Sequence, residues 1–395
     1  MDVKKLFALL LAVLMAFSCL TACTAQTQPA QQDTAQTETQ PDEQPAEQSE
    51  EPVAEPEAEP EEEPAQTVDV TDSLGRVVTI PAEVTSVAPS GAVASMFLAS
   101  IAPEYMVTIN AEPSAAQMAY LDARLAELPA TGQMYGSKAN LNLEALLASG
   151  AQLIIDLGDK KDDMAADLDG LQEQVGIPVV FIEADLPHMA DAYRTLGTIL
   201  SGKAARGEEI AAFVDETVAM AEENSAKIQD DERVSVMYTS GEDGLGTNAK
   251  GSVQAQVLDL VGAENAIVVE DVSNKGGGNI INLEQLYTFD PDVILFAAGS
   301  LYDTVAQDEA WSTLRAVQSG SYCQIPSEPY NWLSNPPSLN MLLGVWWLGN
   351  LLYPQYYDYD MVEKTQEIFQ LFWDYDLSEE EARQMLANST LKATP

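Results

Sequence analysis

Side chains able to perform nucleophilic or multi-ligand metal chemistry are scarce in this sequence. The chain has one histidine, His188, and three cysteines. A Ser-His-Asp or Cys-His arrangement would need His188, which lies in EADLPHMADAY at a predicted first helical turn, with no nucleophile motif nearby. The histidine count excludes zinc or manganese sites built on several histidines. The sequence therefore predicts neither an enzyme nor a resident metal or cofactor, and Cys323 is expected to be a small buried residue.

An acidic residue occurs twice in the same setting. The stretches LNLEALLASGAQLIIDL (141–157) and INLEQLYTFDPDVILFA (281–297) share Asn-Leu-Glu, a Leu two residues after the Glu and an Ile ten residues after it. The two glutamates, Glu144 and Glu284, are 140 residues apart. Each is predicted in a first helical turn, where a carboxylate interacts favourably with the helix dipole by about 0.3–1 kcal/mol. The repeat is explained either by this stabilisation or by two equivalent contact points on two similar halves.

The elements that position these residues form two similar halves. In the first half, strands are predicted at 68–81 (a hairpin), 84–87, 107–109, 153–157 and 179–182, with helices at 92–101, 121–128 and 143–149. In the second half, strands are predicted at 234–238, 266–269, 293–297 and 322–325, with helices at 253–261, 283–288 and 311–316. This alternation predicts an α/β fold with two similar lobes and mostly parallel central sheets.

One long helix is predicted to join the lobes. Residues 203–228 have apolar side chains at helical spacing and no proline, and a helix of that length would measure about 39 Å. The predicted organisation is an N-terminal lobe at 68–185, a helical region at 186–230 that includes this helix, and a C-terminal lobe at 231–395.

The N-terminus predicts export. Residues 1–22 combine two lysines with an apolar run that is short for a membrane span and typical of a secretory signal. They end in Leu-Thr-Ala before Cys23, which resembles the lipobox of bacterial lipoproteins, and that resemblance implies lipid on Cys23 and attachment to the cell membrane. Residues 23–67 are rich in Glu, Gln and Pro, which predicts a disordered acidic tether.

The charge of the remaining chain limits its partners. Residues 67–395 carry 49 acidic and 16 basic side chains, a net charge of −33. Nucleic acid is therefore not an expected partner, because binding to phosphate backbones relies on basic patches. Direct contact with anionic lipid is disfavoured for the same reason.

The order of these features resembles the class III substrate-binding proteins of ABC importers, the group that takes up ferric siderophores, haem and vitamin B12. The run VTDSLGRVVTIP (70–81) is similar to the family's Asp-x-x-Gly-Arg-x-Val-x-Ile-Pro opening. PPSLNMLLGVWWLGNLLYP (336–354) is similar to the C-terminal helix of the iron-chelate branch. Pro291-Asp292 keeps the family's pair before a strand, whereas 150–152 departs from it. The resemblance covers 68 to about 375.

The resemblance implies a function in uptake. It implies a monomeric extracytoplasmic protein without a cofactor of its own, which delivers a small molecule to a permease dimer with a cytoplasmic ATPase. Glu144 and Glu284 match the glutamates through which the family docks on permease arginines, and such pairs are charge-assisted and directional. A sensory or adhesion lipoprotein without a transporter remains an alternative.

The resemblance also places the ligand between the lobes, at the carboxyl ends of strands. The residues expected to contact it are Ser90, Tyr135, Lys160, Tyr238, Ser240, Lys275, Tyr302, Tyr330, Asn331 and Trp332. Such a mixture suits a bulky amphipathic ligand, although Tyr135 and Trp332 are also explained as packing residues. Because these segments contain no arginine, a neutral ferric hydroxamate, a corrinoid or haem is expected before an anionic ferric catecholate. Molybdate or tungstate, held by amides at helix N-termini, is the alternative.

Overall fold

The computed structural model describes residues 66–136 and 139–392, which all belong to one compact unit, Glu62–Pro395. The predicted signal peptide, the lipidation site Cys23 and the acidic segment up to residue 65 lie outside the described residues. Within the described part, no helix is both long enough and apolar enough to cross a membrane.

The N-terminal lobe is built on a parallel sheet with the strand order β3-β4-β5. Its strands are β3 (Val87–Pro89), β4 (Leu153–Gly158) and β5 (Val179–Glu183), and an antiparallel hairpin of β1 (Thr67–Thr71) and β2 (Val77–Pro81) precedes them. Its helices are α2 (Ala92–Ile101), α3 (Ala115–Met118), α4 (Leu143–Ala148) and α5 (Met164–Val175). Every residue of β4 is buried, which explains why this strand is an apolar run interrupted only by Asp156.

The C-terminal lobe repeats this design with a parallel sheet in the order β11-β10-β6-β8. Its strands are β6 (Ser235–Thr239), β8 (Glu264–Asn265), β10 (Val293–Phe296) and β11 (Tyr322–Gln324), and β7 (Gly246–Thr247) pairs antiparallel with β9 (Asn279–Ile280). Its helices are α8 (Gln256–Leu260), α9 (Leu283–Phe289) and α10 (Arg315–Ser319).

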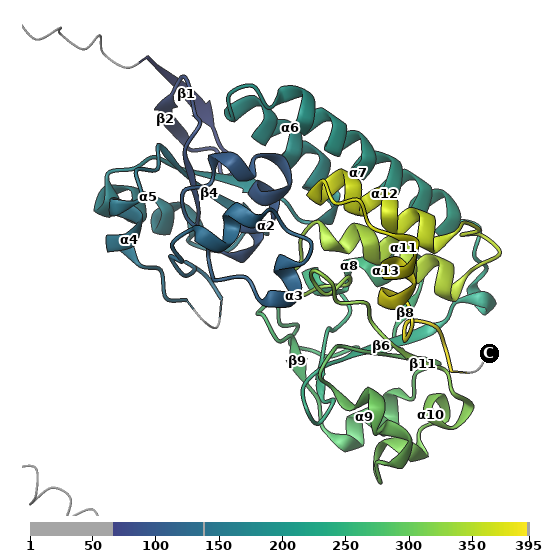
Figure 1. The fold of residues 1–395 in the computed structure, drawn as a ribbon. Helices are drawn as coiled ribbons and strands as arrows, with labels where there is room; N and C mark the ends of the chain where they lie inside the picture. Colours follow the sequence, from purple (N-terminus) through teal and green to yellow (C-terminus); the bar gives the residue numbers. More distant parts are fainter. Residues whose placement is uncertain (1–65, 137–138, 393–395) are drawn as a thin grey trace, which may run out of the picture. The chain divides into compact units, whose positions relative to one another are not determined.

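Helices α6 (Met189–Ile199) and α7 (Ala204–Ser225) connect the two lobes along the chain and run side by side on the outside of the molecule (Figure 1). The two helices approach closely where Gly197 of α6 faces Gly207 of α7. A Cβ atom on Gly207 would lie 2.5 Å from the carbonyl oxygen of Tyr193 and 2.9 Å from Cα of Gly197. Arg194 on α6 also pairs with Glu208 and Asp215 on α7, at 3.0 and 2.6 Å. At 1.5 Å per residue the 22 residues of α7 span about 33 Å.

The last helices return to the middle of the molecule (Figure 1). They are α11 (Asn340–Leu352), α12 (Met361–Trp373) and α13 (Glu379–Met385). Helix α11 packs on α7, where Nε1 of Trp346 donates to Oγ1 of Thr217 at 3.0 Å, and α12 packs on α2 of the N-terminal lobe. One hydrophobic cluster therefore includes residues of both lobes and of these helices.

The predicted α/β fold with two lobes and parallel sheets is confirmed, and Cys323 is fully buried as expected. The strand predicted at 266–269 is wrong. The pairing ends at Asn265, whose side-chain oxygen accepts the N–H of Ile267 at 2.9 Å and turns the chain out of the sheet. Three predicted helices are wholly or partly 3-10 turns, namely η2 (Ala123–Glu127), η5 (Val253–Ala255) and η8 (Trp311–Thr313). The remaining 3-10 turns are η1 (Pro103–Tyr105), η3 (Leu186–His188), η4 (Asp230–Glu232), η6 (Leu301–Asp303) and η7 (Val305–Gln307).

Candidate ligand-binding site

A cavity of about 470 Å³ lies between the two lobes. Its N-terminal wall comprises the residues after β3, the end of β4 and the first residues of α2. Its C-terminal wall comprises the end of β6, the loop around 274–277 and the segment 334–337. The carboxyl ends of parallel strands thus face the cavity from both sheets, which is the common position for ligands in open α/β sheets.

Ser90 organises the N-terminal wall. It follows β3 directly, is buried, and donates its hydroxyl hydrogen bond to Oδ1 of Asp156. Its carbonyl oxygen accepts the N–H of Met134 at 2.8 Å, which holds the following loop, including Tyr135, beside the strand. Nζ of Lys161 lies 5.4 Å from the centroid of the Tyr135 ring, within the range of a cation–π contact.

Asp156 is the only charged residue in the buried strand β4, and it is one of the residues that line the cavity. Burial raises its pKa to about 6, while the hydrogen bond from Ser90 and the charge of Lys161 lower it only in part. Its second oxygen, Oδ2, is buried and accepts no hydrogen bond from the described residues. At neutral pH the wall therefore contains a carboxylate with one unpaired oxygen.

The C-terminal wall carries neutral polar groups. Nδ2 of Asn248 donates to Oγ of Ser334 at 2.9 Å, which ties the 334–337 segment to the lobe. Nε2 of Gln254 donates to the carbonyl oxygen of Asn274 at 3.0 Å, and Oε1 of Gln254 is buried without a donor among the described residues. Tyr238 lies beside these groups, and burial raises the pKa of its hydroxyl.

A second cavity of about 460 Å³ adjoins the first. The two share Ala92, Asn335 and Pro336, and the second is bounded mainly by α2, residues 109–117 and residues 327–331. Among the described residues, the charged side chains in the wall of the first cavity are Asp156, Asp159 and Lys161, and the charged side chain in the wall of the second is Glu112. Neither wall includes an arginine from the described residues.

The structure brings part of the predicted ligand set together. Ser90, Tyr135, Tyr238 and Ser240 line the first cavity, and Tyr330 and Asn331 line the second.

Four predicted residues lie elsewhere. Nζ of Lys160 forms an ion pair with Glu183 at 2.6 Å, and Lys275 is outside the wall although Asn274, Gly276 and Gly277 are in it. Tyr302 packs in the core of the C-terminal lobe. Trp332 is completely buried and donates Nε1 to the carbonyl oxygen of Glu328 at 2.9 Å, which is the packing alternative.

Several wall residues are absent from the predicted set. Asp156 could have been identified from the sequence, because an acidic residue inside the apolar run LIIDLG needs a hydrogen-bond or charge partner when it is buried. Lys161 is next to a predicted residue in the chain. Asn248 and Gln254 follow no pattern in the sequence, since turns after β7 bring them to the wall.

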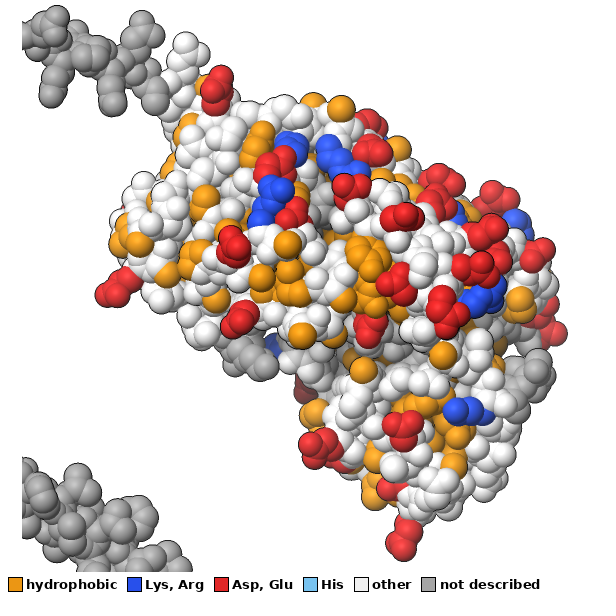
Figure 2. All heavy atoms as spheres, viewed as in Figure 1, with side chains coloured by type: hydrophobic (Ala, Val, Ile, Leu, Met, Phe, Trp, Pro, Cys, Tyr) orange, Lys and Arg blue, Asp and Glu red, His pale blue; other side chains and the backbone are white. Residues whose placement is uncertain are grey.

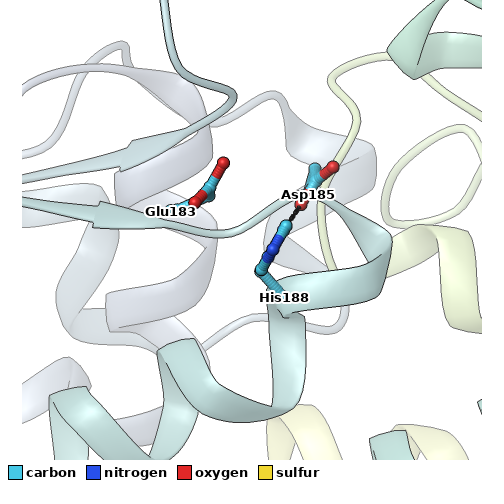
Figure 3. Close-up of side chains that lie close together, drawn as sticks. All are labelled: Glu183, Asp185 and His188. Atoms are coloured by element: carbon cyan, nitrogen blue, oxygen red, sulfur yellow. Dashed lines mark hydrogen bonds and ion pairs between the residues drawn. The ribbon is translucent and has the colours of Figure 1, made fainter. Parts of the chain in front are cut away.

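The single histidine belongs to a small cluster at the end of β5 (Figure 3). Glu183, Asp185 and His188 each place a possible metal-ligating atom within 4.8 Å of the others. These atoms already have protein partners: Lys160 pairs with Glu183, and Asp185 is hydrogen-bonded to His188, which raises the pKa of the imidazole. Nε2 of Gln256, from the other lobe, also donates to Asp185 at 3.1 Å. The cluster thus links the lobes.

The repeated glutamates lie in equivalent places on the two lobes. Glu144 is in the first turn of α4 and Glu284 in the first turn of α9, and both are exposed. Asn142 and Asn282 cap these helices, and the side chain of each accepts a backbone N–H, at 3.1 and 2.9 Å. Neither glutamate forms an ion pair within residues 66–136 and 139–392.

These features define a two-lobed solute-binding protein, and comparisons with known proteins agree. Residues 135–329 match the family described as periplasmic binding protein. An ABC transporter solute binding protein from Sulfurospirillum deleyianum is 26% identical, with a TM-score of 0.74 over 81% of this chain and 99% of that chain.

Two more distant structures share the fold. A molybdate periplasmic binding protein from Haemophilus influenzae is 20% identical, with a TM-score of 0.64 over 79% of this chain and 99% of that one. A Helicobacter pylori protein in a nickel–histidine complex is 14% identical, with a TM-score of 0.61 over 80% of this chain and 98% of that one. No curated protein matches the chain.

The chain matches the periplasmic binding protein family over residues 135–329, and its two-lobed fold is that of an ABC transporter solute-binding protein. It is the extracytoplasmic solute-binding component of an ABC transporter, which works with a membrane permease and its ATPase and binds a small molecule.

Proposed function

We propose that the protein captures a metal chelate, namely a ferric hydroxamate, a corrinoid or haem, between its lobes and delivers it to a permease. The observation that carries this proposal is the pair of adjoining cavities, of about 470 and 460 Å³, lined mainly by aromatic, apolar and neutral polar side chains. Sites of this size and lining suit bulky amphipathic ligands. Any metal arrives inside the ligand, and the protein needs no cofactor of its own.

A thermal-shift panel tests the ligand class. The purified protein is heated with a ferric hydroxamate, cobalamin, haem, a ferric catecholate and molybdate in turn. A ligand present at 100 times its dissociation constant stabilises the folded state by about 2.7 kcal/mol. A clear shift with one of the first three supports the proposal, and the absence of a shift with all three contradicts it.

Molybdate or tungstate is the second candidate. It is favoured by the N-terminus of α2, where Gly91 lines the cavity and no side chain caps the helix, so that backbone N–H groups are available to an anion. The carboxylate of Asp156 in the same wall, whose Oδ2 has no donor among the described residues, opposes a second anion. A shift with molybdate alone would select this candidate.

Glu144 and Glu284 are proposed to dock the loaded protein on arginines of the two permease subunits. Their exposure at equivalent places supports this role, as does an exposed apolar neighbour one turn later in each helix, Leu147 at 55% and Tyr287 at 46% exposure. Two similar lobes facing two equivalent subunits need one anionic contact each.

The docking proposal is tested by the ATPase activity of the reconstituted transporter. Replacing Glu144 and Glu284 together by alanine is expected to abolish stimulation while ligand affinity stays unchanged. The matched control replaces Glu173 and Glu309, which are also exposed, by alanine. This control removes the same amount of charge from the same two lobes. Equal loss in both double variants would mean that only net charge matters. Full stimulation by the Glu144/Glu284 variant would contradict docking through these glutamates, whereas no stimulation by the wild-type protein would favour a sensory or adhesion role without a transporter.

The chain is also proposed to be monomeric and held at the cell membrane by lipid on Cys23. The lipobox-like sequence before Cys23 supports this anchor. A Cys23→Ala variant is expected to move from the membrane fraction to the soluble fraction, and the intact mass of the wild-type protein should include the lipid. Equal membrane retention of both proteins would contradict the anchor.

A further inference from the structure

Two side chains in the wall of the first cavity are almost completely buried and still have an oxygen without a hydrogen-bond donor. Asp156, on the N-terminal lobe, is 3% exposed, and Gln254, on the C-terminal lobe, is 5% exposed. Within the described part of the chain, nothing donates to Oδ2 of Asp156 or to Oε1 of Gln254. Buried acceptors in native proteins are nearly always paired, so two of them around one cavity indicate a partner from outside the chain.

The protein fixes which atoms remain unpaired. The hydroxyl of Ser90 donates to Oδ1 of Asp156, which leaves Oδ2 without a donor. The amide of Gln254 is oriented by its donation to the carbonyl oxygen of Asn274 at 3.0 Å. The opposite orientation would place two oxygens against each other, because an amide oxygen cannot donate. Both lobes therefore offer acceptors, and one of the two is a carboxylate.

We propose that the ligand presents N–H donors to both lobes, with a positively charged group such as an ammonium at Asp156 and a neutral N–H at Gln254. This inference rests on the proposed capture of a chelate and narrows its class. A donor on each side would bridge the lobes through the ligand. Among the described residues of the wall, the acidic groups Asp156 and Asp159 outnumber the basic group Lys161, which also favours a cationic ligand over an anionic one.

The candidate ligands differ in their ability to supply such donors. Molybdate and the carboxylates of haem offer acceptors, which would lie against the acceptors of the wall. Hydroxamate chelates and corrinoids that bear amide N–H or ammonium groups offer donors. The hydroxyl of Tyr135, also buried without a partner among the described residues, can donate or accept and so agrees with either class.

The test uses a matched pair of probes in calorimetric titrations of the purified protein. One probe is a ferric trihydroxamate with a free primary ammonium group, and the other is the same chelate acetylated at that amine. The ammonium form is expected to bind about 10- to 100-fold more tightly, the range for a hydrogen bond to a charged group. Asp156→Asn keeps the side-chain shape and an acceptor for Ser90, and is expected to abolish this preference. Gln254→Met is expected to weaken both probes by about 2- to 10-fold.

Asp162→Asn is the control, because Asp162 is exposed and lies outside the wall of this cavity. It should change the ratio of the two affinities by no more than about fivefold. Equal affinities for the two probes, in the wild-type protein and in Asp156→Asn alike, would overturn the inference and leave capture of a chelate intact. Tighter binding of haem or molybdate than of either probe would overturn it as well. No binding by any compound would overturn the proposed function itself.

Discussion

Replacing Asp156 by asparagine is expected to stabilise the unliganded protein at neutral pH. Burial raises the pKa of Asp156 from an ordinary value of 3.8 to about 6, so the ionised form is disfavoured in the folded state. A difference of about 2 pKa units corresponds to about 3 kcal/mol, and this is the upper limit of the expected gain. Asparagine has the same shape and can still accept the hydrogen bond from Ser90.

The effect has a defined dependence on pH. Between pH 3.8 and about 6 the folded protein keeps a proton on Asp156 that the unfolded chain has released. The stability contributed by this group is therefore complete below pH 3.8 and is lost as the pH rises to about 6. The advantage of Asp156→Asn should be largest at pH 7–8 and should vanish near pH 4.

Urea unfolding of the wild-type protein and of Asp156→Asn, followed by tryptophan fluorescence from pH 4 to pH 8, measures this difference. Asp162→Asn is the control, because Asp162 is exposed and its replacement should change the free energy of unfolding by less than about 0.5 kcal/mol at every pH. The reasoning is refuted if Asp156→Asn is less stable than the wild type at pH 8, or if the difference does not change with pH.

Two further predictions compare matched pairs of substitutions by urea unfolding at neutral pH. Arg76→Ala is expected to cost about 3–5 kcal/mol, because Arg76 pairs at 2.8 Å with the completely buried carboxylate of Asp72. Arg383→Ala removes an exposed pair and should cost less than about 1 kcal/mol, so equal costs would contradict the importance of burial. Gly207→Ala is expected to destabilise by about 1–3 kcal/mol, because its Cβ would clash with α6. Gly170→Ala, in a helix with open space, should stabilise by about 0.5–1 kcal/mol, and the same sign for both alanines would contradict the close-packing argument.

Much of the fold could be predicted from the sequence because most of the parallel strands are short apolar runs that are almost entirely buried. The residues of β4 and β10 are all buried, which is why both runs were recognisable. The strand expected at 266–269 is apolar as well, but the side-chain oxygen of Asn265 accepts the backbone N–H of Ile267, and the chain turns there instead of continuing as a strand. A single side-chain hydrogen bond of this kind leaves no periodic signal, so the pattern alone misplaced the strand.

The candidate site was less predictable. Ser90 and Tyr238 lie at or next to strand ends, so their position follows from the sheet. Gln254 reaches the wall only because the 274–275 backbone accepts its amide, and the sequence carries no sign of that contact. Trp332 was expected to contact the ligand, but it is buried in the core. The sequence could not separate the two roles, because an aromatic side chain suits both a ligand contact and core packing.

The return of the C-terminal helices to the N-terminal lobe has a consequence for biosynthesis. Phe372 of α12 packs on the rings of Tyr193 and Phe213, with ring centroids 6.4 and 5.9 Å apart, and Phe369 packs on Tyr120 at 5.4 Å. A growing polypeptide that contains the whole N-terminal sheet but not α12 therefore leaves these aromatic surfaces open to water. Such an intermediate is prone to self-association. Chaperone protection should thus be needed until α12 has been synthesised and has packed on the N-terminal lobe.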